Sequence, residues 1–200
     1  MKTKTKALGL MMAAVLLVTA TIFGTMAYLT STDEVTNTFT VGSVAITMDE
    51  APVGTDGKEI SGDRVKANSY KLMPGHVYGK DPIVHFQPKS EASWLFIEVT
   101  NEIADIESKA NDYKSIATQI TDNGWTALDS VTGVYYKSVP ANTGDAAVDY
   151  PVFQGFTVDG SVTGITLESY NSKTVKIIAY AVQADGFTTA SDAWTIGLGK

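Results

Sequence analysis

Residues 94–100 read Trp-Leu-Phe-Ile-Glu-Val-Thr and give the strongest strand signal in the chain. The run is rich in β-branched and aromatic residues, and it is apolar at even and odd positions alike until Glu98. Because neighbouring side chains of a strand point to opposite faces, such a run is buried on both sides, so we expect it in the centre of a packed sheet. Residues 173–183 (Lys-Thr-Val-Lys-Ile-Ile-Ala-Tyr-Ala-Val-Gln) predict a second long central strand.

Shorter strand patterns surround these two runs. A parity switch at Gly42, within the strand pattern of residues 36–48, indicates a bulge or kink. Residues 140–150 read as a loop, and residues 164–168 predict a short edge strand. Further strands are predicted at 80–86, 125–128, 134–139 and 152–158. Many short strands separated by Gly, Pro, Asn and Asp turns favour one antiparallel β-sandwich over a parallel α/β sheet.

The hydrophobic period changes to that of a helix between residues 103 and 120. Apolar residues recur there at steps of three and four, namely Ile106, Ala110, Tyr113, Ile116, Ala117 and Ile120. The spacing predicts one amphipathic helical insert over about 103–120 that caps an end or edge of the sandwich. Residues 189–194 predict a closing helical turn, with Trp194 covering one end of the core.

The first 27 residues have the layout of a cleavable signal peptide. Lys2, Lys4 and Lys6 precede a run, residues 7–23, that contains no charge. Small residues, Thr25 and Ala27, stand at the −3 and −1 positions of a cut before Tyr28. A retained anchor is the alternative, because the run approaches the roughly 20 residues that cross a bilayer. In both interpretations the rest of the chain is exported. We predict that residues 1–27 are the signal peptide and that residues 28–200 form one β-sandwich domain.

Composition narrows the class of partner and the compartment. Residues 1–27 hold three of the 15 basic residues and none of the 22 acidic ones, so the mature charge is 12 − 22 = −10. Such a surface repels nucleic acid, and we expect no nucleic-acid partner. The chain contains no cysteine, which excludes disulfides, thiol catalysis and cysteine-ligated metal. An exported domain without cysteine fits a bacterial surface.

The sequence offers no residue set for catalysis. Its two histidines, His76 and His85, are not part of a His-Glu-x-x-His motif and are only weak candidates for metal ligands. Gly-x-Ser-x-Gly and phosphate-binding glycine loops are missing as well. Asp and Glu are dispersed as on a solvated surface, with a structural calcium ion as a minor alternative. We therefore predict a protein that is not an enzyme and has no cofactor.

Three stretches carry a resemblance to a known family. The junction reads Gly24-Thr25-Met26-Ala27, then an aromatic, a Thr/Ser/Asp run and Asn37-Thr38-Phe39-Thr40-Val41-Gly42. Met73-Pro74-Gly75 precedes Lys80-Asp81-Pro82-Ile83-Val84. Residues 179–187, together with Ala193-Trp194, resemble the last strand and the C-terminal tail of that family. The chain thus resembles the TasA/camelysin family, exported bacterial proteins that a SipW-type signal peptidase processes.

This resemblance implies a jelly-roll sandwich with helical additions, secreted to the cell surface or the biofilm matrix. It also implies fibres in which the freed N-terminal segment of one subunit completes a sheet of the next, the self-association called donor-strand exchange. The donor would be Tyr28–Phe39, with Leu29, Val35 and Phe39 as its inward residues. Other matrix proteins are further partners. Pairing of this segment within its own domain is the alternative.

Two other functions stay open from the sequence. Camelysin members carry a metallopeptidase label, which would make the chain a secreted metalloendopeptidase. The missing zinc motif argues against carrying that activity over. A monomeric module that binds carbohydrate or a surface is the other alternative, because the strands contain many aromatic residues.

Overall fold

The computed structural model describes residues 2–26, 42–108 and 113–200. The chain divides into two compact units between residues 40 and 41. The described part of the first unit is the helix α1 (Lys2–Met26), which contains Thr25. Of the helices in the described residues, none is both long and apolar enough to cross a membrane. Ala27 and the predicted donor segment Tyr28–Phe39 lie outside the described residues.

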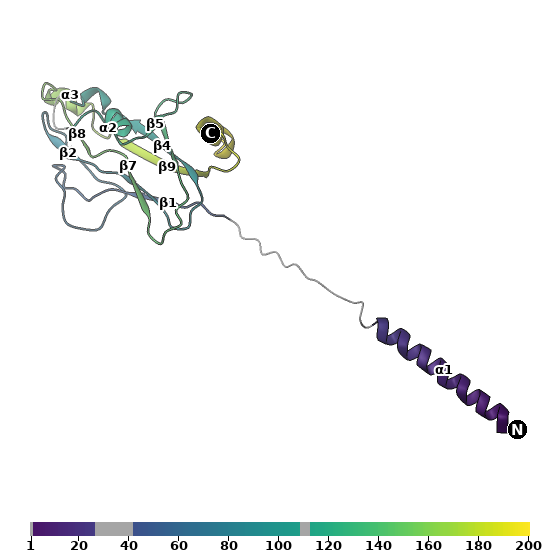
Figure 1. The fold of residues 1–200 in the computed structure, drawn as a ribbon. Helices are drawn as coiled ribbons and strands as arrows, with labels where there is room; N and C mark the ends of the chain where they lie inside the picture. The colour runs from purple at the N-terminus through teal and green to yellow at the C-terminus, as the bar shows by residue number, and fades with distance from the viewer. Residues whose placement is uncertain (1, 27–41, 109–112) are drawn as a thin grey trace. The chain divides into compact units, whose positions relative to one another are not determined.

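The second unit is mainly β, and its paired strands run antiparallel, which confirms the predicted class (Figure 1). A four-stranded sheet has the order β5 (Thr126–Ala127), β6 (Val134–Val139), β4 (Ser93–Asn101) and β9 (Val175–Gln183). A three-stranded sheet has the order β1 (Ile46–Asp49), β3 (Ile83–Phe86) and β7 (Val148–Pro151). A third sheet pairs β2 (Val77–Gly79) with β8 (Gly155–Thr157).

The two smaller sheets are successive parts of one long strand pair. The chain runs from β2 into β3 and, on the other side, from β7 into β8. Between them, the N–H of Lys80 donates to the carbonyl of Gln154 (3.1 Å) and the N–H of Val152 donates to that of Pro82 (2.9 Å). The segment Lys80-Asp81-Pro82 therefore occupies the place where the ladder bends, at which a proline without an N–H is tolerated.

Strand β4 is buried on both faces, as its sequence predicts. Leu95 and Ile97 point into the main core, which the smaller sheets share through Val84 and Phe86. On the opposite face, Phe96 belongs to a second core. Its ring centroid lies 5.2 Å from that of Trp194. Two apolar layers against one strand explain why both parities are apolar.

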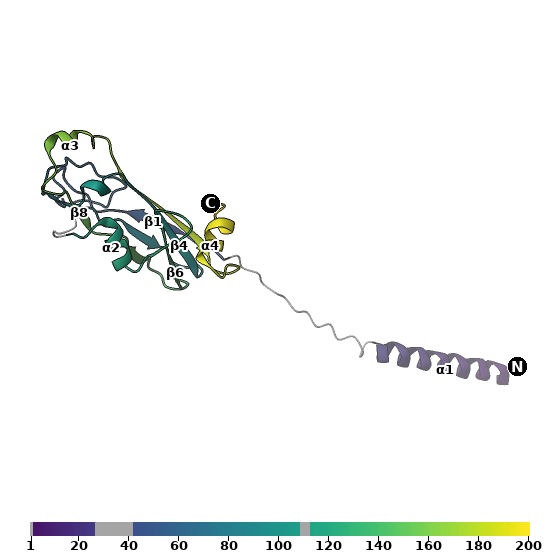
Figure 2. The same cartoon turned by 90° about the horizontal axis from the view of Figure 1, so that it is seen from above.

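The second core is closed by the end of the chain. Helix α4 (Ala190–Asp192) continues into one π-helical turn, η2 (Ala193–Gly197), beside the four-stranded sheet (Figure 2). The hydroxyl of Thr189 accepts the N–H of Asp192 (3.1 Å) and so begins the helix. The predicted closing turn and the covering role of Trp194 are confirmed.

The single helix predicted over 103–120 is wrong. The described residues form a 3₁₀ turn, η1 (Ala104–Ile106), and a separate helix, α2 (Ile116–Asp122). Glu107 is extended and makes a β-bridge with Val158. Its carboxylate is buried, and it accepts the side-chain amide of Asn101 (2.5 Å) and the N–H of Ile116 (2.9 Å). These tertiary hydrogen bonds replace the helical ones that the sequence period predicts.

Two strand predictions and one loop prediction also need correction. Residues 164–168 form the helix α3 (Gly164–Glu168), begun by the hydroxyl of Thr163, which accepts the N–H of Thr166 (3.2 Å). The loop predicted over 140–150 contains most of β7. Most consequentially, β9 is not central: within the described residues it pairs with β4 alone, so it is the edge strand of its sheet.

Candidate functional site

A groove of about 980 Å³ lies beside the edges of two sheets. We call it the edge groove. One wall is the start of β9 with the turn before it, and the other is the end of β1 with the loop of residues 66–74. Helix α3 contributes Gly164, Leu167 and Glu168. Because β1 and β9 are each terminal in their sheets, the groove runs between two strand edges.

The outer edge of β9 has backbone groups for which the described residues provide no hydrogen-bond partner. Two backbone hydrogen bonds lie just beyond the ends of β9: the N–H of Ala184 donates to the carbonyl of Ala92, and the N–H of Glu102 donates to the carbonyl of Thr174. The register of β9 with β4 is continuous between these bonds, so even-numbered residues of β9 bond to β4. The odd-numbered ones, including Val175 and Ile177, therefore direct their N–H and C=O groups to the free edge. Such an edge is a template for another strand.

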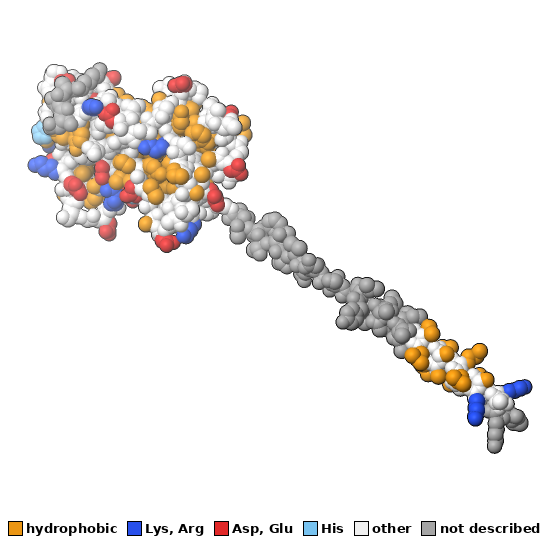
Figure 3. Space-filling view, in the orientation of Figure 1, with side chains coloured by type: hydrophobic (Ala, Val, Ile, Leu, Met, Phe, Trp, Pro, Cys, Tyr) orange, Lys and Arg blue, Asp and Glu red, His pale blue; other side chains and the backbone are white. Residues whose placement is uncertain are grey.

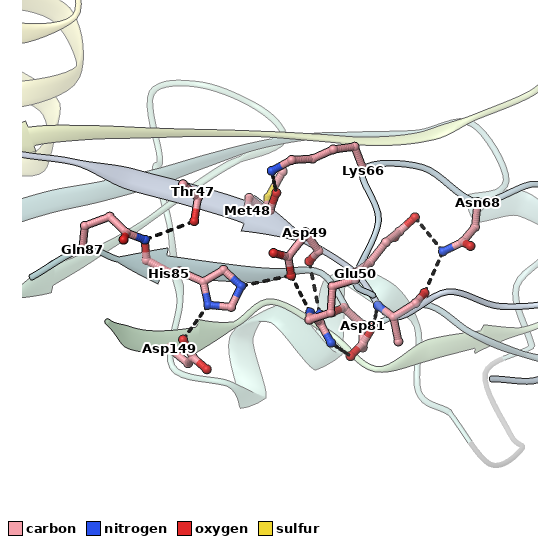
Figure 4. A network of polar contacts seen from close by, with 12 residues as sticks. Thr47, Met48, Asp49, Glu50, Lys66, Asn68, Asp81, His85, Gln87 and Asp149 are labelled. Carbon is pink, nitrogen blue, oxygen red and sulfur yellow. Dashed lines mark hydrogen bonds and ion pairs between the residues drawn. The ribbon is translucent and has the colours of Figure 1, made fainter. Parts of the chain in front are cut away.

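The β1 wall is partly closed already. Beyond the end of β1, Glu50 and Val65 exchange two backbone hydrogen bonds of 2.9 and 2.8 Å. The ammonium group of Lys66 donates to the carbonyl of Met48 and covers another outward group of this edge (Figure 4). The two walls of the groove thus differ: a loop covers the β1 edge, whereas no second strand in the described part of the chain pairs with β9.

The floor of the groove holds a buried polar cluster. Glu50 and Lys80 are 4% and 9% exposed, and Lys80 Nζ lies 2.5 Å from Glu50 Oε2. The other oxygen, Glu50 Oε1, accepts the side-chain amide of Asn68 at 3.0 Å (Figure 4). Nearby, the Tyr70 hydroxyl donates to the carbonyl of Gly79 (3.0 Å), and burial together with the charge of Glu50 raises the pKa of Tyr70.

The next residue, Asp81, ties the loop to the sheet. Its Oδ1 accepts the N–H of Ala51 at 2.6 Å, and its Oδ2 lies 3.0 Å from the guanidinium of Arg64. Arg64 also contacts Asp49. Lys80-Asp81-Pro82 therefore does three things at one bend: Lys80 pairs inside the groove, Asp81 fixes the loop and Pro82 accepts a ladder bond.

His85 lies on the outward face of the three-stranded sheet, between two carboxylates (Figure 4). Its Nε2 is 3.0 Å from Asp49 and its Nδ1 is 2.6 Å from Asp149. Burial alone would lower the pKa of His85, but the hydrogen bonds and charges of Asp49 and Asp149 outweigh it, so the pKa is raised. Burial would likewise raise the pKa of Asp49, yet its bonds to His85 and Arg64 lower it.

The predicted metal candidates are not brought together. His76 is exposed before β2, with its ring 6.4 Å from that of Tyr78, whereas His85 belongs to β3 in another sheet. Within residues 2–26, 42–108 and 113–200, no group of three or more His, Asp or Glu side chains could hold a metal ion. His85 instead takes part in a charged network of hydrogen bonds.

Sequence reasoning missed the groove and its floor. Glu50, Asn68 and Arg64 lie in residues 49–68, a polar stretch whose sequence predicts a hairpin loop or a mobile excursion. Only Lys80-Asp81-Pro82 stood out, as part of the family resemblance, and its sequence carries no signal of a buried ion pair. Of the predicted donor residues, Leu29, Val35 and Phe39 fall outside the described residues, as does the cleavage-site residue Tyr28.

Comparisons of the chain with protein-family models, with curated proteins and with solved structures found no match. Any functional assignment therefore has to come from the residues and their geometry.

Proposed function

We propose that this chain is a structural protein of the TasA/camelysin kind, exported to a bacterial cell surface or biofilm matrix, where it polymerises by donor-strand exchange. The segment Tyr28–Phe39 of one copy, freed by a SipW-type peptidase, lies along β9 of another copy and fills its edge groove. The paired antiparallel sheets form a jelly-roll sandwich that this added strand completes. Other matrix proteins associate with the polymer.

The observation that carries the proposal is the free edge of β9 where it borders the groove. A long, apolar and half-buried edge strand is a hazard that monomeric proteins usually block with charge, proline or a covering loop. The β1 edge has such a cover in Lys66 and Val65. Among the described residues no second strand is hydrogen-bonded to β9, although β1 packs close to it, and an added strand would satisfy its odd-numbered N–H and C=O groups.

Charge matches the donor to the groove. The chain is acidic, yet the lining of the groove contains five lysines (Lys66, Lys71, Lys80, Lys173 and Lys176) against three acids (Asp49, Glu50 and Glu168). The donor segment has two acidic residues, Asp33 and Glu34, and no basic one. Opposite charges of this kind speed encounter and select one partner over others.

The surface of the β unit is also suited to association. In the space-filling view, apolar side chains gather in patches on one face of it, with charged groups interspersed (Figure 3). Neither alternative function gains a comparable observation. His76 precedes β2 and His85 belongs to β3, so this arrangement adds no support for the metalloendopeptidase alternative.

Electron microscopy of two chains tests the proposal. We expect the chain that begins at Tyr28 to form fibres and the chain that begins at Thr40 to stay monomeric. Synthetic peptide 28–39 should then bind the shorter chain, and a peptide with Leu29, Val35 and Phe39 replaced by Ser should not, because its inward side chains are lost. Equal assembly of the two chains would overturn donor-strand exchange.

A further inference from the structure

The buried cluster in the groove floor brings a nucleophile, an acid–base group and an electrophile together. Lys80 supplies an amine, Asn68 a carboxamide, and Glu50 lies between them. Glu50 is the only described partner of the Lys80 ammonium group, which has three N–H donors and is 9% exposed. This contact places the Glu50 carboxylate where it can act as a general base toward the Lys80 amine.

The amide of Asn68 is held in an orientation that fits acyl transfer. Its Oδ1 accepts the backbone N–H of Val53 at 3.0 Å. Its Nδ2 donates to Glu50 Oε1 (3.0 Å) and to the carbonyl of Ala51 (2.9 Å). A fixed N–H at the carbonyl oxygen stabilises negative charge that develops there, as in an oxyanion hole. The leaving nitrogen, meanwhile, touches the same carboxyl group that contacts the nucleophile.

We propose that Lys80 and Asn68 join through an intramolecular amide crosslink, with Glu50 as the proton carrier. This modification does not require the proposed fibre, because all three residues belong to one chain and one loop–strand contact, although it would neutralise one of the five groove lysines. Its consequence is a covalent bond between the loop of residues 50–70 and the bend at Lys80-Asp81-Pro82.

The reaction balances without an added reagent. Glu50 takes a proton from the Lys80 ammonium, and the lone pair of the neutral amine forms a bond to Cγ of Asn68. The carbonyl electrons move to Oδ1, opposite the N–H of Val53. Glu50 then passes its proton to Nδ2 and takes one from the new C–N nitrogen. The Cγ–Nδ2 bond breaks, ammonia leaves, and it carries away the remaining proton as ammonium, so Glu50 is ionised again.

Mass spectrometry of the folded full chain tests the crosslink. We expect an intact mass below the sequence mass by one ammonia, about 17 Da. Trypsin should not cut after Lys80, because the side chain is then an amide. The digest should contain peptide 67–71 joined to peptide 72–89, and peptide 72–80 should be missing. Joined peptides also separate this modification from cyclisation at Asn123-Gly124, which loses the same mass without joining anything.

Variants assign the roles. Glu50→Gln keeps the shape but cannot carry protons, so its mass should equal the sequence mass, as should that of Lys80→Arg. Lys66→Arg is the matched control, because Lys66 lines the same groove but contacts a backbone carbonyl, and it should still lose ammonia. If a variant fails to fold, the digest of the wild-type chain is sufficient to test the crosslink. Free peptides 67–71 and 72–80 at their sequence masses would overturn the proposal.

Discussion

Strands β4 and β9 are neighbours of equal length with similar apolar sequences, but they have different surroundings. In β4, Leu95, Phe96 and Ile97 are fully buried, whereas no residue of β9 is fully buried. The difference comes from pairing: β4 lies between β6 and β9, while β9 has one described partner. An apolar run therefore reveals that a strand needs two covered faces, and it does not reveal whether both edges are already paired within the chain.

The largest expected effect comes from blocking the free edge. Ala179→Pro removes an outward N–H of β9 without touching the ladder to β4, so we expect it to abolish fibre formation and leave the monomer folded. Ala127→Pro is the matched control, because Ala127 lies at the opposite edge of the same sheet. Sedimentation and electron microscopy measure both. If Ala179→Pro assembled as well as Ala127→Pro, β9 would not be the acceptor.

A smaller effect separates the two strands by burial. Ile97→Ala in β4 creates a cavity in the main core and should lower the free energy of unfolding by about 2–5 kcal/mol. Ile177→Ala in β9 removes a half-buried side chain against the same core and should cost about 1 kcal/mol in the monomer. Denaturant unfolding of the two variants checks the order. Equal losses would mean that β9 is as well packed as β4 before any partner binds.

The contrast between β4 and β9 also explains which parts of the fold can be predicted from the sequence. The predictions for residues 94–100 and for Trp194 are confirmed. A strand that is buried on both faces has apolar residues at consecutive positions, and this pattern is visible in the sequence. The helix over 103–120 failed, because the carboxylate of Glu107 is satisfied by Asn101 and Ile116, residues that no local pattern connects to it. The groove floor was not predicted for a similar reason, because Glu50, Asn68 and Lys80 come together only when the loop folds back onto the bend.

The smallest expected effect concerns the β1 wall. Charged side chains stabilise this wall, whereas apolar burial stabilises the β9 wall. The raised pKa of His85 contributes stability below its ordinary value of 6.5, and this is lost as pH rises through the raised pKa. The lowered pKa of Asp49 contributes stability above its ordinary value of 3.8, and this is lost as pH falls through the lowered pKa. Both contributions are fully present between about pH 4 and about pH 6.

Unfolding of wild type and His85→Gln, from about pH 4 up through the raised pKa of His85, measures this effect. The wild type should exceed the variant in unfolding free energy most between about pH 4 and about pH 6, and the difference should shrink as the pH rises through the raised pKa of His85. The difference between wild type and Ile177→Ala serves as the control and should hardly change with pH. A constant difference for His85→Gln would show that the ion pairs with Asp49 and Asp149 contribute nothing measurable.

Amide hydrogen exchange along the edge of β9 shows whether a donor strand docks there. In the monomer that begins at Thr40, the N–H groups of Val175, Ile177 and Ala179 should exchange quickly, while those of β4 are protected. Addition of peptide 28–39, or assembly of the chain that begins at Tyr28, should protect these odd-numbered amides and leave β4 unchanged. Fibres in which the three amides still exchange as quickly as in the monomer would contradict the proposed docking of the donor strand along β9.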